Sequence, residues 1–263
     1  MEALAPLFSV SYLRSIWDQD FRAWSGSPDA AAMRQRLDQW AGKLFQKETA
    51  AEGTFVDVFF KQTWGYIAAG QVAPGMPFTC WSQFDVANAG AGGGTGAADL
   101  ALGRFAPGQP HVPQVLCEFK DVRSGLDRKQ NRKGSTRSPV EQCFDYLRES
   151  RQGRTGRPLP TWAVVTDMNE FRLYTWGRRD ACQRFVVRRP AGEDGIVLTD
   201  EGPDADFQRF LFARMFRPGF LLGDAGPSDL ERCLADQGIH ERALEDGFYR
   251  DYAAYRETLI EAL

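Results

Sequence analysis

The sequence predicts an α/β fold, with a mixed β-sheet flanked by helices, and this prediction depends on three observations. The first 67 residues carry apolar side chains at helical intervals of three and four. Residues 78–189 contain short segments rich in β-branched and aromatic residues, bounded by Gly, Pro and Asn. One well-marked helix separates two of these segments, which is typical of a crossover between parallel strands.

Three N-terminal helices are expected first, and six strands follow them. The helices cover residues 9–24, 29–50 and 53–67. The strands cover residues 78–87, 98–105, 114–122, 161–168, 170–176 and 183–189. The crossover helix follows the third strand, where Ser138 can cap it, Pro139 can be its first residue, and Glu141 can complete a capping box.

The C-terminal part is expected to be helical after an irregular stretch between residues 190 and 205. Residues 206–216 form one helix, and a second begins at Ser228, again with a capping box through Glu231. We therefore expect a domain of residues 1–205 that contains the N-terminal helices and the sheet, and a helical connector of residues 206–263. The last helix carries four apolar residues that need a partner: Tyr252, Tyr255, Leu259 and Ile260.

Composition excludes several classes of protein. Of the 263 residues, 43% are hydrophobic and 25% charged, which is ordinary for a globular protein, and the net charge of −3 gives no overall sign of a polyanionic partner. The five cysteines are scattered and odd in number, which argues against a disulfide framework or a zinc site. Neither a signal peptide nor a membrane-spanning apolar run is present, so we expect a cytoplasmic protein without membrane contact.

Other catalytic motifs are missing. The glycine-rich residues 88–99 lack both the Gly-Lys-Ser/Thr ending of a phosphate loop and a following helix, so we interpret them as a flexible turn. His111 and His240 are the only histidines and lie far apart, which argues against histidine-dependent nucleases and serine hydrolases. The Asn-Pro-Pro-aromatic motif of adenine methyltransferases does not occur.

Two carboxylates and an amine interrupt the apolar strands. Glu118 and Lys120 are two residues apart on one strand and therefore share a face, whereas Phe119 points into the core. If the neighbouring strand pairs with this one, Asp99 lies alongside Glu118. Adjacent carboxylates repel each other unless a cation lies between them, and hard oxygen ligands favour Mg²⁺, with Mn²⁺ as a substitute. Such an arrangement is suited to phosphodiester hydrolysis.

The spacing Asp99…Glu118-Phe119-Lys120 resembles the D…(D/E)xK signature of restriction-endonuclease-like nucleases. Gln142 and Tyr146, four residues apart on the crossover helix, resemble the QxxxY motif of the RecB-like branch. Residues 40–190 together resemble the N-terminal nuclease region of fused type IIG-like restriction–modification enzymes. In those enzymes, a DNA adenine methyltransferase follows in the same chain.

The resemblance implies a role for each site residue. Asp99, Glu118 and the main-chain carbonyl of Phe119 would bind the metal, and Lys120 would position the attacking water or help to deprotonate it. Gln142 would orient the lysine or a phosphate oxygen, and Glu48 would hold a metal-bound water. The products would carry 5′-phosphate and 3′-hydroxyl ends. S-adenosylmethionine would bind only in a methyltransferase and target-recognition part beyond Leu263, which would also supply sequence specificity.

Each of these residues also has a purely structural interpretation. Asp99 can cap the turn after the glycines, and Glu118 with Lys120 can form an exposed pair on an edge strand. Glu52 shares a helix face with Glu48 and competes with it as the helical acid. Tyr146 can be a core aromatic residue. The alternative functions are a non-cleaving module that binds DNA or joins domains, and a nuclease of the same fold in another defence or repair system.

A basic segment leaves the Glu118–Lys120 strand directly. Such a run is usually a solvated surface, but its attachment to a phosphodiesterase site favours contact with the backbone of double-stranded DNA. The expected DNA-binding residues are Arg123, Arg128, Lys129, Arg132, Lys133 and Arg137.

Overall fold

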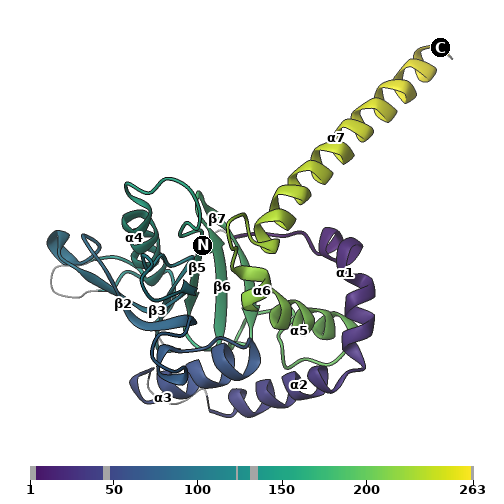
Figure 1. Ribbon diagram of the computed structural model, residues 1–263. Helices are drawn as coiled ribbons and strands as arrows, with labels where there is room; N and C mark the ends of the chain where they lie inside the picture. Colours follow the sequence, from purple (N-terminus) through teal and green to yellow (C-terminus); the bar gives the residue numbers. More distant parts are fainter. Residues whose placement is uncertain (1–3, 44–47, 123, 131–135, 262–263) are drawn as a thin grey trace.

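The computed structural model describes residues 4–43, 48–122, 124–130 and 136–261. Among them, seven strands form one sheet in the order β1-β7-β6-β5-β4-β3-β2 (Figure 1). The strands are β1 (Ala5–Pro6), β2 (Phe78–Val86), β3 (Gly96–Phe105), β4 (Val115–Phe119), β5 (Trp162–Thr166), β6 (Glu170–Thr175) and β7 (Arg178–Val186). β1 runs parallel to β7 and β4 parallel to β5, while the other neighbours are antiparallel. The sheet is therefore mixed, as the sequence predicts.

The helices are α1 (Val10–Ser25), α2 (Pro28–Ala41), α3 (Glu48–Phe55), α4 (Pro139–Arg151), α5 (Pro203–Met215), α6 (Pro218–Leu221) and α7 (Asp229–Glu261). α4 is the expected crossover between the parallel strands β4 and β5. Serine caps begin four of them, because Ser9, Ser27, Ser138 and Ser228 each accept a hydrogen bond from a backbone N–H three residues ahead. Both predicted capping boxes are confirmed, with Glu141 and Glu231 accepting in return from the capping serines.

The two faces of the sheet support two separate cores. Alternating strand residues such as Cys117 and Phe119 face α1, α2, α3, α5 and α6, whereas Leu116 and Val165 face α4. The larger core is unusually aromatic. α3 continues into a π-helix, Val56–Thr63, whose wider turns bring Phe59 and Phe60 towards the sheet.

Several expected boundaries are wrong. The single helix over residues 29–50 is two helices, because α2 ends at Ala41 and α3 begins at Glu48. The last strand begins at Arg178 instead of residue 183, since the hairpin turn at Gly177 follows β6 directly. The short elements β1 and α6 carry too few residues to show a periodicity.

α5 packs within the larger core, whereas its helical pattern was expected to belong to the connector of residues 206–263. Phe207, Phe210 and Phe212 of α5 are buried with residues of α1, α2 and the sheet. The larger core therefore continues past residue 205.

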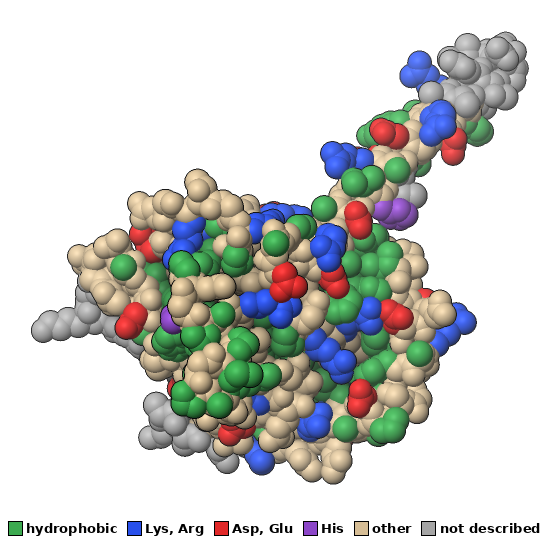
Figure 2. All heavy atoms as spheres, in the orientation of Figure 1, with side chains coloured by type: hydrophobic (Ala, Val, Ile, Leu, Met, Phe, Trp, Pro, Cys, Tyr) green, Lys and Arg blue, Asp and Glu red, His purple; other side chains and the backbone are tan. Residues whose placement is uncertain are grey.

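α7 begins on this body and then projects away from it (Figure 1). Figure 2 shows apolar, acidic and basic side chains interspersed along the projecting part. Its exposed aromatic residues include Phe248, Tyr249, Tyr252 and Tyr255, while Leu259 and Ile260 lie outside the described side chains. Within the described residues, no helix combines the length and the apolar character needed to cross a bilayer.

Candidate active site

The site is built where β3 and β4 pair. Leu100 pairs with Cys117 in this antiparallel ladder, so the next pair along places Asp99 opposite Glu118. A carboxylate oxygen of Asp99, Oδ2, accepts a hydrogen bond of 2.6 Å from the backbone N–H of Phe119. The predicted proximity of Asp99 to the Glu118–Lys120 segment is thus present in the fold.

Lys120 lies at the end of β4, where its backbone N–H donates to the carbonyl oxygen of Thr166 on β5 at 2.8 Å. Its ammonium donates to Glu118 Oε1 and, at 2.8 Å, to the carbonyl oxygen of Phe119. Glu118 is 1% exposed and Lys120 3% exposed, so this is a buried ion pair and not an exposed pair on an edge strand. Asp99 is half-buried.

Phe119 points to the other side of the sheet, as predicted. Its ring lies 5.2 Å from that of Phe55 and 5.8 Å from that of Phe60, in the larger core. This packing anchors the strand end from behind, and it turns Glu118 and Lys120 to the face that α4 covers. The local alternation of the strand therefore sets the direction of both charged side chains.

α4 supplies the remaining wall. Tyr146 is 2% exposed, and its ring packs so closely on Gly96 that a Cβ there would lie 2.8 Å from it. Burial raises the pKa of the Tyr146 phenol, and the negative charges of Glu118 and Asp99 raise it further, while the hydrogen bond from Gln142 lowers it. Tyr146 therefore stays a neutral phenol beside the two carboxylates.

Gln142 lies one helical turn before Tyr146, and its amide Nε2 donates to the Tyr146 hydroxyl at 2.5 Å. The expectation that Gln142 orients Lys120 or a phosphate oxygen stays a prediction, since its described hydrogen bond goes to Tyr146. Cys143 on the same helix is fully buried against β4, where its thiol donates to the carbonyl oxygen of Leu116. Burial raises the pKa of its thiol, and the nearby charges of Glu118 and Asp99 add to the increase.

Two further residues near the site, Asp167 and Gly96, are not predicted by the sequence motifs. Asp167 follows β5, is 8% exposed, and accepts hydrogen bonds from the backbone N–H groups of Asn169 and Glu170 at 3.0 and 2.6 Å. Burial raises its pKa to about 6, although the two backbone hydrogen bonds lower it. The available signal is an acid directly after a buried strand and before a turn. Gly96 allows the ring of Tyr146 to pack against the start of β3, and nothing in the sequence distinguishes it from the neighbouring glycines.

The helical acid stays a prediction. Glu48 is the first residue of α3, and its side chain lies outside the described ones. Glu52 is half-buried on the same helix. The helix itself packs through Ala51 and Phe55 on the Phe119 side of the sheet.

The basic segment is described only in part, because Arg123, Arg132 and Lys133 lie outside the described residues. Arg128 and Lys129 are exposed. Arg137 is half-buried, with hydrogen bonds to Asp145 at 2.5 Å and to the carbonyl oxygen of Ala89 at 3.2 Å. Of the described positions, Arg128 and Lys129 offer their charges to solvent, while Arg137 joins the turn after β2 to α4.

The donor chemistry of the site fits a hard divalent cation. Two carboxylates and a main-chain carbonyl oxygen converge at the end of β4, and the Lys120 ammonium already places a positive charge between Glu118 and the Phe119 carbonyl. Mg²⁺ is usually held by one or two carboxylates and keeps several waters. Within the described residues, no cluster of three or more His, Cys, Asp or Glu side chains is arranged to hold a metal. A metal here would therefore depend on the carbonyl oxygen and on water.

Comparisons of the chain with models of protein families, with curated proteins and with solved structures find no match.

Proposed function

We propose that this chain is a Mg²⁺-dependent DNA endonuclease domain, of the kind that restriction–modification enzymes carry. The observation that carries the proposal is the pairing of β3 with β4, which places Asp99 opposite Glu118 with Lys120 on the same face. A structural pair alone would need one acid and one base, whereas this face holds a second carboxylate.

In the proposed reaction, Asp99, Glu118 and the Phe119 carbonyl would hold the metal. A bound Mg²⁺ supplies a polarised phosphate and a water of lowered pKa. Lys120 would then leave its contact with Glu118, donate to a non-bridging phosphate oxygen and stabilise the charge that develops there. Tyr146, a neutral phenol at physiological pH, would line the site next to the carboxylates without adding negative charge.

We propose that the segment after Lys120 moves when substrate binds, because Glu118 and Lys120 are almost fully buried. That segment packs Leu126 onto the α4 side, where the Leu126 carbonyl accepts from the N–H of Val140, and Asp127 pairs with Arg172 at 2.7 Å. Arg128 and Lys129 follow directly and are exposed. We propose that double-stranded DNA binds these basic residues through its phosphates and displaces the segment from the site.

The projecting α7 supports a second element of the proposal, that the domain is joined to a part that reads DNA sequence. Four exposed aromatic residues on one helix, Phe248, Tyr249, Tyr252 and Tyr255, form a surface suited to packing. This same feature favours the alternative of a module that joins domains without cleaving DNA. Metal-dependent cleavage separates the two functions.

The test uses supercoiled plasmid and the purified chain with Mg²⁺, Mn²⁺ or chelator. We expect Mg²⁺ and Mn²⁺ to support nicking that chelator abolishes, and we expect Asp99→Asn, Glu118→Gln and Lys120→Met to remove it. Asp180→Asn, at an exposed position on β7, is the matched control and should cleave like the wild type. Equal nicking by the wild type and all three site variants would contradict the proposal.

A further inference from the structure

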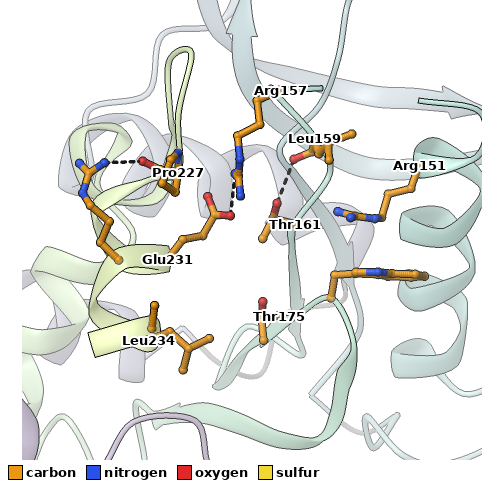
Figure 3. A pocket seen from close by; sticks show the side chains of 11 residues that line it. Arg151, Arg157, Leu159, Thr161, Thr175, Pro227, Glu231 and Leu234 are labelled. Atoms are coloured by element: carbon orange, nitrogen blue, oxygen red, sulfur yellow. Dashed lines mark hydrogen bonds and ion pairs between the residues drawn. The ribbon is translucent and has the colours of Figure 1, made fainter. Parts of the chain in front are cut away.

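A second concave site lies at the other end of the parallel strands β4 and β5 from Lys120. It has a volume of about 460 Å³ and lies between the end of α4, the segment that enters β5, the end of β6 and the start of α7. Figure 3 shows the guanidinium groups of Arg151 and Arg157 directed into the same space, with Glu231 opposite them. Thr161 lies between the two arginines, and Thr175 lines the cavity further towards Leu234.

The charges around this cavity do not balance. Three arginines line it against one carboxylate, Glu231, and that carboxylate is paired with Arg157 at 2.7 Å. Arg232 pairs with Asp229 and donates to the carbonyl oxygen of Pro227. Arg151 forms no ion pair with any residue in the described part of the chain. The excess positive charge therefore lies at Arg151.

Arg151 is held in place without an anion. Its Nη1 donates to the carbonyl oxygen of Pro160, and its guanidinium lies 5.0 Å from the centre of the Trp176 ring. Burial lowers the pKa of Arg151, and the nearby positive charge of Arg157 lowers it further. A guanidinium has five N–H donors, and that of Arg151 donates to the Pro160 carbonyl through Nη1, so further N–H groups remain to bind an anion.

We infer that this cavity binds a phosphate monoester. Two guanidinium groups directed into one space match the bidentate geometry that phosphate oxygens prefer, and the unpaired charge of Arg151 attracts an anion. The hydroxyl of Thr175, a residue only 6% exposed, adds a donor at the floor. The volume is within the range of small-ligand sites, which suits a mononucleotide or the 5′-phosphorylated end of a nucleic acid.

The inference does not depend on the proposed nuclease activity. Thr161 precedes β5, whereas Glu118 and Lys120 lie where β4 ends, and the two strands are parallel. None of the residues that line the cavity belongs to the carboxylate site. Loss of one site should leave the other intact.

Binding is measured by isothermal titration calorimetry and thermal shift with inorganic phosphate, adenosine monophosphate, and a trinucleotide with either a 5′-phosphate or a 5′-hydroxyl. We expect phosphate and the phosphorylated ligands to bind and to raise Tm. Arg151→Gln and Arg157→Gln should each weaken binding about tenfold, the usual effect of removing one charged hydrogen bond. Arg151→Lys keeps the positive charge but loses the planar set of N–H donors, so its affinity should lie between those of the wild type and Arg151→Gln.

Arg154→Gln is the matched control, because Arg154 is exposed nearby and lines a different cavity. Binding of adenosine monophosphate alone would identify a free nucleotide as the ligand, and binding of the phosphorylated trinucleotide as well would identify a nucleic-acid end. Equal binding of the two trinucleotides would overturn the inference, since it would place a backbone diester in the cavity. The absence of binding at millimolar phosphate, or equal binding by the Arg151 and Arg154 variants, would also overturn it.

Discussion

Two segments of this chain have the same local pattern and different surroundings. Glu118–Lys120 and Glu170–Arg172 both consist of glutamate, phenylalanine and a basic residue, at the end of β4 and the start of β6. Both phenylalanines enter the larger core and contact the ring of Phe55, at 5.2 and 5.5 Å between centroids. In both, the basic side chain donates to the glutamate two residues before it.

The two segments differ in the charged residue that the neighbouring strand places beside each glutamate. β7 places Arg184 beside Glu170, which therefore pairs with two arginines, at 2.5 and 2.8 Å. Burial alone would raise the pKa of Glu170, but the hydrogen bond from Arg184 and the charge of Arg172 hold it below its ordinary value. β3 instead places a second acid, Asp99, beside Glu118. One segment places a glutamate between two arginines, and the other brings two carboxylates together with one lysine.

The largest difference between the two segments is expected when the glutamate of each is replaced by glutamine. We expect Glu118→Gln to lower plasmid cleavage about a thousandfold, the scale of losing a group that holds a catalytic metal. Its loss of stability should be smaller than that of Glu170→Gln, because relief of the repulsion with Asp99 offsets part of the cost of removing the buried partner of Lys120. Glu170→Gln should retain cleavage but lose about 2–3 kcal/mol of unfolding free energy, since Arg172 and Arg184 lose their shared acceptor. Plasmid cleavage assays measure the loss of activity, and urea unfolding measures the loss of stability. If the two variants lost activity and stability to the same extent, the two segments would not differ in function.

The basic segment connects the two regions, because Asp127 within it pairs with Arg172. Replacement of Arg128, Lys129, Arg132 and Lys133 by glutamine should weaken DNA binding for all sequences alike. The slope of log K against log salt should fall by about one per lost phosphate contact. Fluorescence anisotropy across a salt series measures this slope. Arg22→Gln, at an exposed position on α1, is the control, and an unchanged slope would make the segment a solvated surface.

Asp167 lies in the turn between the two regions, and its effect depends on pH. Its pKa is about 6 in the folded protein against an ordinary 3.8, so the folded state binds this proton more tightly. Its carboxylate therefore costs stability above pH 6, and the cost disappears as the pH falls towards 4. Asp167→Asn keeps an oxygen for the Asn169 and Glu170 N–H groups and should gain about 1–3 kcal/mol at pH 8 and nothing at pH 4. Urea unfolding at both pH values checks this, and equal gains at both would contradict it.

Tyr146→Phe should have the smallest effect. The ring remains against Gly96, and only the hydroxyl that accepts from Gln142 is lost. We expect a loss of about 0.5–1.5 kcal/mol in unfolding free energy and a cleavage rate within about threefold of the wild type. A hundredfold loss of cleavage with normal stability would show instead that the hydroxyl takes part in the reaction.

Local patterns made much of the fold predictable. The capping boxes at Ser138 and Ser228 and the crossover helix depend on residues near in sequence, and they are present as expected. The direction of Phe119 follows from strand alternation alone. The end of α2 at Ala41 and the start of β7 at Arg178 were missed, because apolar residues continue through the first break and polar residues occupy the second.

The order of residues along the chain sets which residues alternate on each strand, where the serine-capped helices α4 and α7 begin, and that Glu118 and Lys120 share a face. The sequence could not show that Glu118 and Glu170 have different charged partners, because each is followed by a phenylalanine and then by a basic residue. Tertiary structure decided that difference by pairing one strand with β3 and the other with β7. The interaction between two charges depends on their distance and on the surrounding dielectric, and only the completed sheet sets both.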